Sequence, residues 1–219
     1  MSIKPSLKFL LDQKKKDFEL TASETKKKIY KQGIDAIKYS ALIKNAKQVG
    51  DIAPNFVLDN ATGNLIELSD YLKKGPVVLT WYRGGWCPYC NLTLRQLQLE
   101  LPNFKAFGGN LITLTPELPD KSLSTVEKHH LEFEVLSDIG NKVARNYGIV
   151  FKLTNEVSNI YNESFRMNEY NGDTSNELPL AATYVINKEG KIIYAFLDVD
   201  YKNRAEPSEI TTVLKSIKN

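Results

Sequence analysis

The fold of this chain is decided by one stretch, Trp81-Tyr82-Arg83-Gly84-Gly85-Trp86-Cys87-Pro88-Tyr89-Cys90-Asn91. A short apolar and β-branched run at residues 77–80 precedes it and predicts a buried strand. Leucines at helical spacing follow between residues 92 and 101 and predict a helix. Pro88 suits the first turn of that helix, because a proline lacks only an N–H that has no helical partner there. The predicted order is therefore strand, glycine loop, cysteine pair and helix.

This order predicts a redox centre. It places Cys87 at a helix N-terminus, where free N–H groups and the helix dipole favour a thiolate. A thiol with an ordinary pKa of about 8.5 becomes a usable nucleophile in such a setting. Cys90 lies three residues further on, about one helical turn away. The two sulfur atoms are then close enough to form a disulfide after a small adjustment.

A zinc site is the alternative use of two cysteines at this spacing. Zinc in a structural site needs four ligands. The other candidate ligands, His129 and His130, are the only histidines in the chain. They are adjacent in the sequence and therefore point in different directions. We expect no metal site and no cofactor.

Composition argues against several other functions. The chain has 219 residues, 42% of them hydrophobic, and a formal net charge of only +3. That charge is too small to favour nucleic acid or a membrane surface as a partner. Both cysteines belong to the one motif, whereas a secreted disulfide scaffold disperses its cysteines. The apolar run at 9–11 is too short for a signal peptide or a membrane span. The sequence therefore predicts a cytoplasmic protein.

Residues 1–49 predict a lysine-rich N-terminal helical extension. Thr21-Ala22-Ser23-Glu24 has the spacing of a capping box, so we expect a break between two helices near residue 20. In the second helix Tyr30, Ile34 and Ile37 lie on one stripe. The sequence leaves open whether this stripe packs on the main domain or forms a homodimer contact. Residues 50–54 are interpreted as a linker.

Residues 50–219 alternate strands with helices, which favours an α/β domain whose sheet is covered on both faces. The polar segment 152–178 is long for a structureless loop, so it carries a short helix or shapes the site. The other expected elements are a hairpin at 55–59 and 64–68, strands at 110–115 and 133–136, helices within 121–130 and 141–147, a hairpin at 182–187 and 191–196, and a helix from Pro207 to about residue 218.

The chain resembles the peroxiredoxin-like proteins of the alkyl hydroperoxide reductase / thiol-specific antioxidant (AhpC/TSA) family. The likeness runs in order from about residue 50 to about residue 215. It implies a thioredoxin-like fold, with a central mixed β-sheet flanked by helices. Besides the cysteine stretch it rests on Gly50-Asp51-x-Ala53-Pro54-x-Phe56-x-Leu58, Gly75-Pro76-Val77-Val78, Leu136-Ser137-Asp138 with Val143-Ala144-Arg145-x-Tyr147-Gly148, Leu178-Pro179 before Thr183-Tyr184-Val185-Ile186, and Asp198-x-Asp200-Tyr201-x-x-Arg204-x-Glu206-Pro207.

The resemblance implies a peroxidase mechanism. Cys87 would be the peroxidatic cysteine, whose thiolate attacks hydrogen peroxide or an organic hydroperoxide and becomes a sulfenic acid. Cys90 would be the resolving cysteine, which condenses with it to a disulfide that a thioredoxin-like donor reduces. Trp86 adjoins the nucleophile and is expected to screen it from water. Pro179 matches the position where the fold carries a cis-proline beside the cysteines, and the sequence leaves its isomer open.

Three positions depart from the family pattern. Typical peroxiredoxins carry a proline seven residues and a hydroxyl side chain three residues before the nucleophile, where this chain has Thr80 and Gly84. We expect the Thr80 hydroxyl to contribute to substrate binding, with Trp86 and Pro179. The family also has an arginine just before the late strand, where this chain has Ala181.

The cation that stabilises a departing oxygen must therefore come from elsewhere in the chain. Arg83, four residues before the nucleophile, is the first candidate, and Arg145 is the second. Arg83 is equally suited to pair with a carboxylate such as Asp138. Arg204 and Asp200 near the C-terminus are interpreted as a structural ion pair.

Two other functions remain open from the sequence. A thiol-disulfide oxidoreductase would carry the same cysteine motif, because Cys-Pro-Tyr-Cys is also the glutaredoxin sequence. A non-catalytic thioredoxin-fold module could bind a partner through its N-terminal helices. The second is disfavoured, because a binding module has no use for two cysteines at redox spacing.

Overall fold

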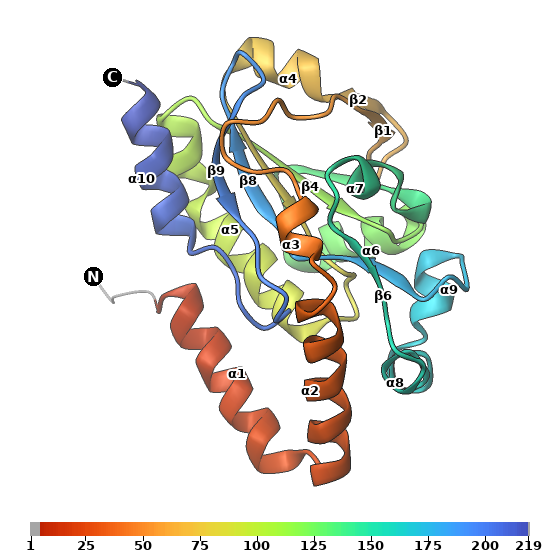
Figure 1. Ribbon diagram of the computed structural model, residues 1–219. Coiled ribbons are helices and arrows are strands. Elements are labelled where there is room, and N and C mark those ends of the chain that lie inside the picture. Colours follow the sequence, from red (N-terminus) through yellow and green to blue (C-terminus); the bar gives the residue numbers. More distant parts are fainter. Residues whose placement is uncertain (1–4, 219) are drawn as a thin grey trace.

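A five-stranded mixed sheet forms the centre of the molecule (Figure 1). The computed structural model describes residues 5–218, so residues 1–4 of the expected extension lie outside the described part. Strands β3, β4 and β5 run parallel, and β8 runs antiparallel to both β3 and β9. The order across the sheet is β5 (Glu134–Ser137), β4 (Asn110–Thr115), β3 (Val77–Trp81), β8 (Thr183–Ile186) and β9 (Ile192–Phe196).

Helices cover both faces of the sheet, because successive side chains of a strand point to opposite faces. Val78 of β3 and its partner Val185 pack with α5 and α10, whereas Leu79 and its partner Tyr184 pack in the layer that holds α4 and α7. Every residue of β3 is buried, as expected for a central strand. The helix bounds are Leu68–Lys74 for α4, Pro88–Ala106 for α5, Pro119–His129 for α6, Lys142–Asn146 for α7 and Pro207–Lys218 for α10, with a 3₁₀ turn η1 at Ile139–Asn141.

The structure confirms the expected α/β architecture and both hairpins. Strands β1 (Val57–Asp59) and β2 (Leu65–Glu67) pair antiparallel, as do β8 and β9. Residues 50–54 are not a free linker, because Gly50 and Ala53 donate backbone hydrogen bonds of 2.8 Å to Ile192 and Gly190. This segment therefore lies against the β8–β9 hairpin.

The polar segment at 152–178 carries two helices and shapes the site. Strands β6 (Val150–Lys152) and β7 (Glu177–Pro179) pair antiparallel around α8 (Asn155–Phe165) and α9 (Met167–Asn171). Every peptide bond within residues 5–218 is trans, including the bond before Pro179. The segment brings α8 against the N-terminal extension.

The N-terminal extension is a helical hairpin of α1 (Leu7–Thr21) and α2 (Glu24–Lys38), followed by the short α3 (Leu42–Asn45). The break falls where expected, but the cap was assigned to the wrong residue. Ser23 caps α2 by accepting from the Lys26 N–H, whereas Thr21 ends α1 and donates its hydroxyl to the Asp17 carbonyl. The side chain that caps α2 is therefore that of Ser23, the residue directly before the helix.

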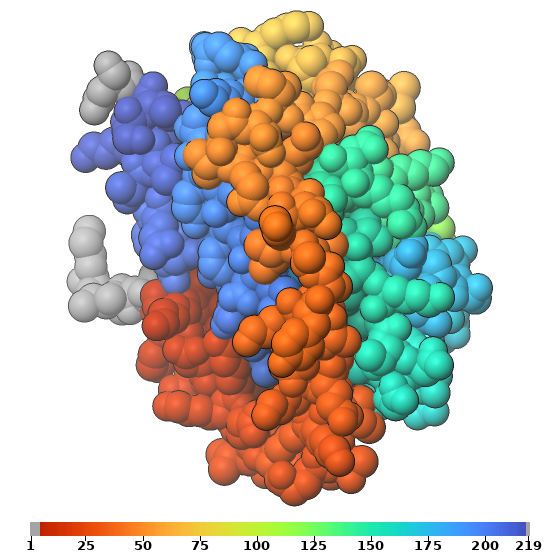
Figure 2. Space-filling model, viewed as in Figure 1, coloured from red at the N-terminus to blue at the C-terminus, as the bar shows by residue number. Residues whose placement is uncertain are grey.

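The apolar stripe of α2 packs on the main domain. Tyr30 lies in one buried cluster with Val157 and Tyr161 of α8, and Ile37 reaches the sheet core. In Figure 2 the orange surface of α2 lies between the blue C-terminal segment and the teal segment that holds β6 and α8. The stripe therefore packs on the main domain, which is one of the two placements that the sequence left open.

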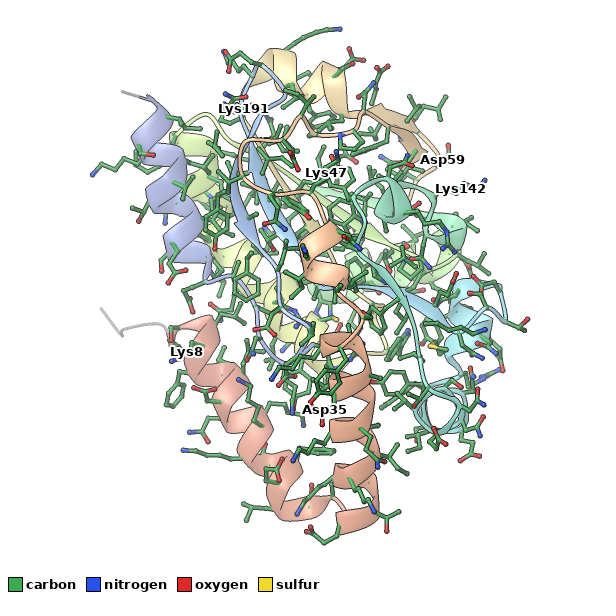
Figure 3. All side chains as sticks on the ribbon, viewed as in Figure 1. Lys8, Asp35, Lys47, Asp59, Lys142 and Lys191 are labelled. Atoms are coloured by element: carbon green, nitrogen blue, oxygen red, sulfur yellow. The ribbon has the colours of Figure 1, made fainter. Side chains whose placement is uncertain are left out.

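Helix α1 is fixed by its apolar face and by its N-terminus. Leu7 and Leu11 are buried in the cluster that contains both cysteines. The Glu206 carboxylate accepts the free N–H groups of Leu7 at 3.0 Å and Lys8 at 2.9 Å, so it caps α1 from the other end of the chain (Lys8 is labelled in Figure 3). No helix within residues 5–218 is long and apolar enough to cross a membrane.

This cap predicts a measurable contribution to stability. Glu206→Ala leaves two helix N–H groups without their charged acceptor, so we expect the free energy of unfolding to fall by about 1–2 kcal/mol. Urea denaturation followed by circular dichroism measures the change. The exposed Glu189→Ala, in the β8–β9 turn, is the matched control. An equal loss in both variants would contradict the cap.

Candidate active site

The loop between β3 and α5 requires its two glycines. Gly84 has a φ of 150°, and a Cβ there would lie 2.2 Å from the Trp86 indole nitrogen. A Cβ at Gly85 would lie 2.2 Å from the Thr125 hydroxyl. Cys87 occupies the N-cap position of α5, with Pro88 as the first helical residue. The predicted order of strand, glycine loop, cysteine pair and helix is confirmed.

The two thiols are fully buried, and their pKa values are shifted in opposite directions. Both side chains are 0% exposed and both are free thiols. Burial raises the pKa of Cys87, but a hydrogen bond from the Cys90 thiol and the charges of Arg83 and Arg204 outweigh it and hold that pKa well below its ordinary value. Burial and the adjacent Cys87 sulfur raise the pKa of Cys90 well above its ordinary value. These surroundings therefore favour the thiolate at Cys87 and the neutral thiol at Cys90.

Arg83 provides the closest positive charge. One guanidinium nitrogen donates to Cys87 Sγ at 3.3 Å and the other terminal nitrogen donates to the Tyr161 hydroxyl at 2.9 Å. The side chain is only 3% exposed, and no carboxylate within residues 5–218 forms an ion pair with it. The alternative pairing with Asp138 is wrong, because that carboxylate caps α7 by accepting from Val143 and Ala144.

Aromatic rings enclose the Arg83 guanidinium. Its central carbon lies 3.9 Å from the centre of the Tyr201 ring, 5.2 Å from that of Tyr161 and 5.4 Å from that of Trp86. Tyr30 from α2 contacts Tyr161 and Tyr201 edge to face. The negative faces of such rings favour a cation in a site that excludes water. We call these four rings the aromatic cage.

Two cavities adjoin the aromatic cage, and Arg83 lines both. One has a volume of about 150 Å³, and the other, of about 20 Å³, has room for one water-sized molecule. The larger lies beneath the α1–α2 hairpin and is also lined by Trp86 and Tyr89. The smaller is also lined by Pro179 and Ala181. Two of the three expected substrate-binding residues, Trp86 and Pro179, thus lie beside the cavities at Arg83.

Thr80 and Arg145 lie elsewhere. The Thr80 hydroxyl donates to the Ala182 carbonyl at 3.0 Å and bonds the Thr183 hydroxyl at 2.7 Å, so it joins β3 to β8. These contacts give no support to a role of Thr80 in substrate binding. Arg145 is half exposed and pairs with Glu177. Arg145 therefore does not supply the cation for which it was the second candidate after Arg83.

Arg204 provides a second cation beside the cysteines. The interpretation of Arg204 as the ion-pair partner of Asp200 was wrong. Asp200 pairs instead with Lys202 at 3.6 Å. One nitrogen of Arg204 donates to Cys90 Sγ at 3.5 Å, and the other terminal nitrogen donates to the carbonyls of Tyr201 and Asn203. Sequence spacing suggested a local ion pair, but the bend of the chain turns the guanidinium toward the sulfur.

Glu117 is a buried carboxylate that supports the glycine loop. One of its oxygens accepts the Gly85 N–H at 2.9 Å, and the other accepts the Thr115 hydroxyl at 3.4 Å. The side chain is 0% exposed, and burial raises its pKa to about 7. The carboxylate thus holds the loop that positions Cys87.

Sequence reasoning missed Glu117, Tyr161 and Tyr30 as parts of the site, and it did not assign Tyr201 or Arg204 to the cysteines. Tyr161 lies in a polar segment and Tyr30 in the extension, so neither is near the motif in sequence. The available signal was the density of tyrosine, 11 in the chain. Within residues 5–218 no cluster of three or more His, Cys, Asp or Glu side chains is placed to hold a metal ion.

The raised pKa of Glu117 predicts that the free energy of unfolding depends on pH. Between pH 4.5 and about 7 the unfolded chain loses this proton while the folded chain retains it, so the free energy of unfolding falls as pH rises. We expect wild type to lose about 2.5 kcal/mol relative to Glu117→Gln between pH 5 and pH 8. Urea denaturation of both proteins across this range measures it. A constant difference would show that Glu117 titrates normally.

Comparison with known proteins agrees with the fold. The AhpC/TSA family model matches residues 49–195. The protein named "Putative peroxiredoxin bcp" of Buchnera aphidicola subsp. Schizaphis graminum is 33% identical over 123 residues, which cover 54% of this chain and 77% of that protein. The thiol-disulfide oxidoreductase ResA of Bacillus anthracis is 26% identical over 164 residues, 74% of this chain and 78% of ResA.

A solved structure shows the same fold. Peroxidoxin BcpB from Mycobacterium tuberculosis superposes with a TM-score of 0.62 at 20% identity, covering 78% of this chain and 99% of that one. The family match includes the strand, the glycine loop, both cysteines and Arg83. With that extent of matching, the chain belongs to the AhpC/TSA family.

Proposed function

We propose that this enzyme is a thiol peroxidase that reduces hydrogen peroxide or organic hydroperoxides through Cys87 and Cys90. A buried guanidinium requires an anion, because leaving an isolated charge in a dry site is costly. The anion that Arg83 meets is the Cys87 sulfur at 3.3 Å. This pairing is the observation that carries the proposal, since it stabilises the thiolate and places a cation where the peroxide reacts.

Arg83 also retains a donor for the substrate. Its Nε group is buried and has no hydrogen-bond partner within residues 5–218. A peroxide oxygen that enters the cavity beside Arg83 would accept from it. As the O–O bond breaks, negative charge develops on the departing oxygen, and a fixed cation stabilises that charge more than it stabilises the neutral peroxide.

The first step is a two-electron transfer from sulfur. The Cys87 thiolate attacks the terminal oxygen of the hydroperoxide, forming an S–O bond and breaking the O–O bond. The sulfur is oxidised to a sulfenic acid, and the peroxide is reduced to an alcohol or to water after the leaving oxygen takes up a proton. Cys90 then displaces the oxygen of the sulfenic acid, forming the disulfide and releasing water.

A thioredoxin-like dithiol donor would recycle the disulfide by thiol–disulfide exchange. The predicted cytoplasmic location would supply such a donor, because that compartment keeps thiols reduced. A thiol-disulfide oxidoreductase is the second candidate, and the likeness to ResA favours it. Arg83 beside the sulfur favours the peroxidase, because exchange between thiols develops no charge on oxygen.

The decisive experiment follows tryptophan fluorescence after the reduced protein is mixed with excess hydrogen peroxide. Trp86 adjoins Cys87, so oxidation changes its surroundings. We expect a fast change that is lost in Cys87→Ser and retained in Cys90→Ser, where a dimedone adduct traps the sulfenic acid. A wild-type rate no greater than that of a free thiol, with ready exchange with small disulfides, would establish the oxidoreductase instead.

Arg83→Met tests the cation. It removes the charge and the hydrogen bond that hold the pKa of Cys87 low, so we expect the second-order rate constant with peroxide to fall by about 100-fold or more. Arg83→Lys should recover part of the loss. The half-exposed Arg145→Met is the matched control and should react like wild type. Equal rates in Arg83→Met and wild type would contradict the role of Arg83.

A further inference from the structure

A second cation, partly buried, lies at the second thiol. Arg204 donates to Cys90 Sγ at 3.5 Å, and its remaining contacts are backbone carbonyls. No carboxylate within residues 5–218 forms an ion pair with it. Its positive charge is therefore directed at sulfur without being neutralised by an acid.

The chain segment before Arg204 is held in place. Asp198 accepts the backbone N–H of Asp200 and the side-chain amide of Asn203, each at 2.8 Å. Lys15 of α1 donates to Asn203 Oδ1 at 2.9 Å. Arg204 then forms part of the wall of a cleft of about 460 Å³ between α1 and this segment. These bonds position the guanidinium before any reaction occurs.

In the reduced protein the thiolate at Cys87 keeps Cys90 protonated. The Cys90 thiol donates its hydrogen to Cys87, and a second negative charge beside the first would be repelled. The thiol that must act as the second nucleophile is thus held in its unreactive form. A resolving step requires that this restraint be removed.

We propose that Arg204 converts Cys90 from a hydrogen-bond donor into the resolving nucleophile once Cys87 has been oxidised. The inference rests on the proposed peroxidase function. When Cys87 becomes a sulfenic acid, its negative charge is lost, and two guanidiniums then face one ionisable thiol. The charge balance of the site favours a thiolate at Cys90, next to the sulfur that it must attack.

The step balances without an added reactant. Cys90 loses its proton, and its thiolate attacks the Cys87 sulfur, so that an S–S bond forms while the S–O bond breaks. The departing hydroxide takes up one proton and leaves as water. One thiol and one sulfenic acid thus become one disulfide and one water.

Few charged groups other than Arg204 face Cys90. The titratable or charged groups around it are Cys87, Arg83, Arg204 and the Tyr82 phenol. Burial raises the pKa of Tyr82 well above its ordinary value, so the phenol stays neutral. Arg83 already donates to Cys87 and Tyr161. Helix α1 adds only the apolar Leu7 and Leu11 to this cluster.

Arg204→Met separates the two steps of the reaction. The first step is followed by tryptophan fluorescence, and the second by the decay of dimedone-reactive sulfenic acid and the loss of free thiol. We expect the first step to slow less than the second, because Arg83 still contacts Cys87. We expect the second to slow by about tenfold or more at pH 7, with its pH profile moved to higher pH, since each unit of pKa costs tenfold in thiolate.

Arg204→Lys keeps the charge and should recover part of the second rate, and Lys202→Met, two residues away, should match wild type in both steps. Equal slowing of both steps in Arg204→Met, or an unchanged second step, would overturn the role of Arg204 while leaving the peroxidase intact. If Arg204→Met fails to fold, an unchanged second step and pH profile in Arg204→Lys and in Arg204→Gln would overturn it. No fast first step in wild type would overturn both proposals.

Discussion

The positive charge of Arg83, buried beside the Cys87 sulfur and without an ion pair to any carboxylate that the structure describes, is the constraint on which the site depends. A guanidinium in a dry environment is tolerated only when its donors and its charge are matched. Tyr161 accepts one of its hydrogen bonds, the aromatic cage faces its charge, and Cys87 supplies the negative partner. The same arrangement keeps the sulfur ionised, so the stability of the site and its reactivity have one physical cause.

Much of the surrounding structure holds Arg83 and Cys87 in this arrangement. The glycine loop allows the chain to turn between β3 and α5 without a side chain meeting Trp86 or Thr125. The Glu117 carboxylate accepts the Gly85 N–H of that loop. The N-terminus of α5 then presents Cys87 with no side chain capping it, which leaves free N–H groups near the thiolate.

The parts of the structure that depend on local pattern could be predicted from the sequence. β4 occupies residues 110–115 as expected, since an apolar run between turns specifies a buried strand. The position of Cys87 at a helix start followed from Pro88 and the leucines after it. The parts that depend on tertiary contact could not. Arg204 and Asp200 are close enough in sequence to suggest an ion pair, and only the folded chain shows that the guanidinium reaches Cys90. Tyr161 likewise had no local signal, because its role depends on α8 lying against α2.

Several of the residues that enclose the cysteines lie outside the span that the family model matches. The family match covers residues 49–195, whereas Leu7, Leu11 and Tyr30 precede it, and Tyr201 and Arg204 follow it. The matched span carries the nucleophile, Arg83 and part of the aromatic cage, and the two flanking segments add the rest of the cover and the second cation. Substitutions in the two flanks alone can therefore change solvent access and the electrostatics of the second thiol. The inherited sheet and the cysteine turn would remain as they are.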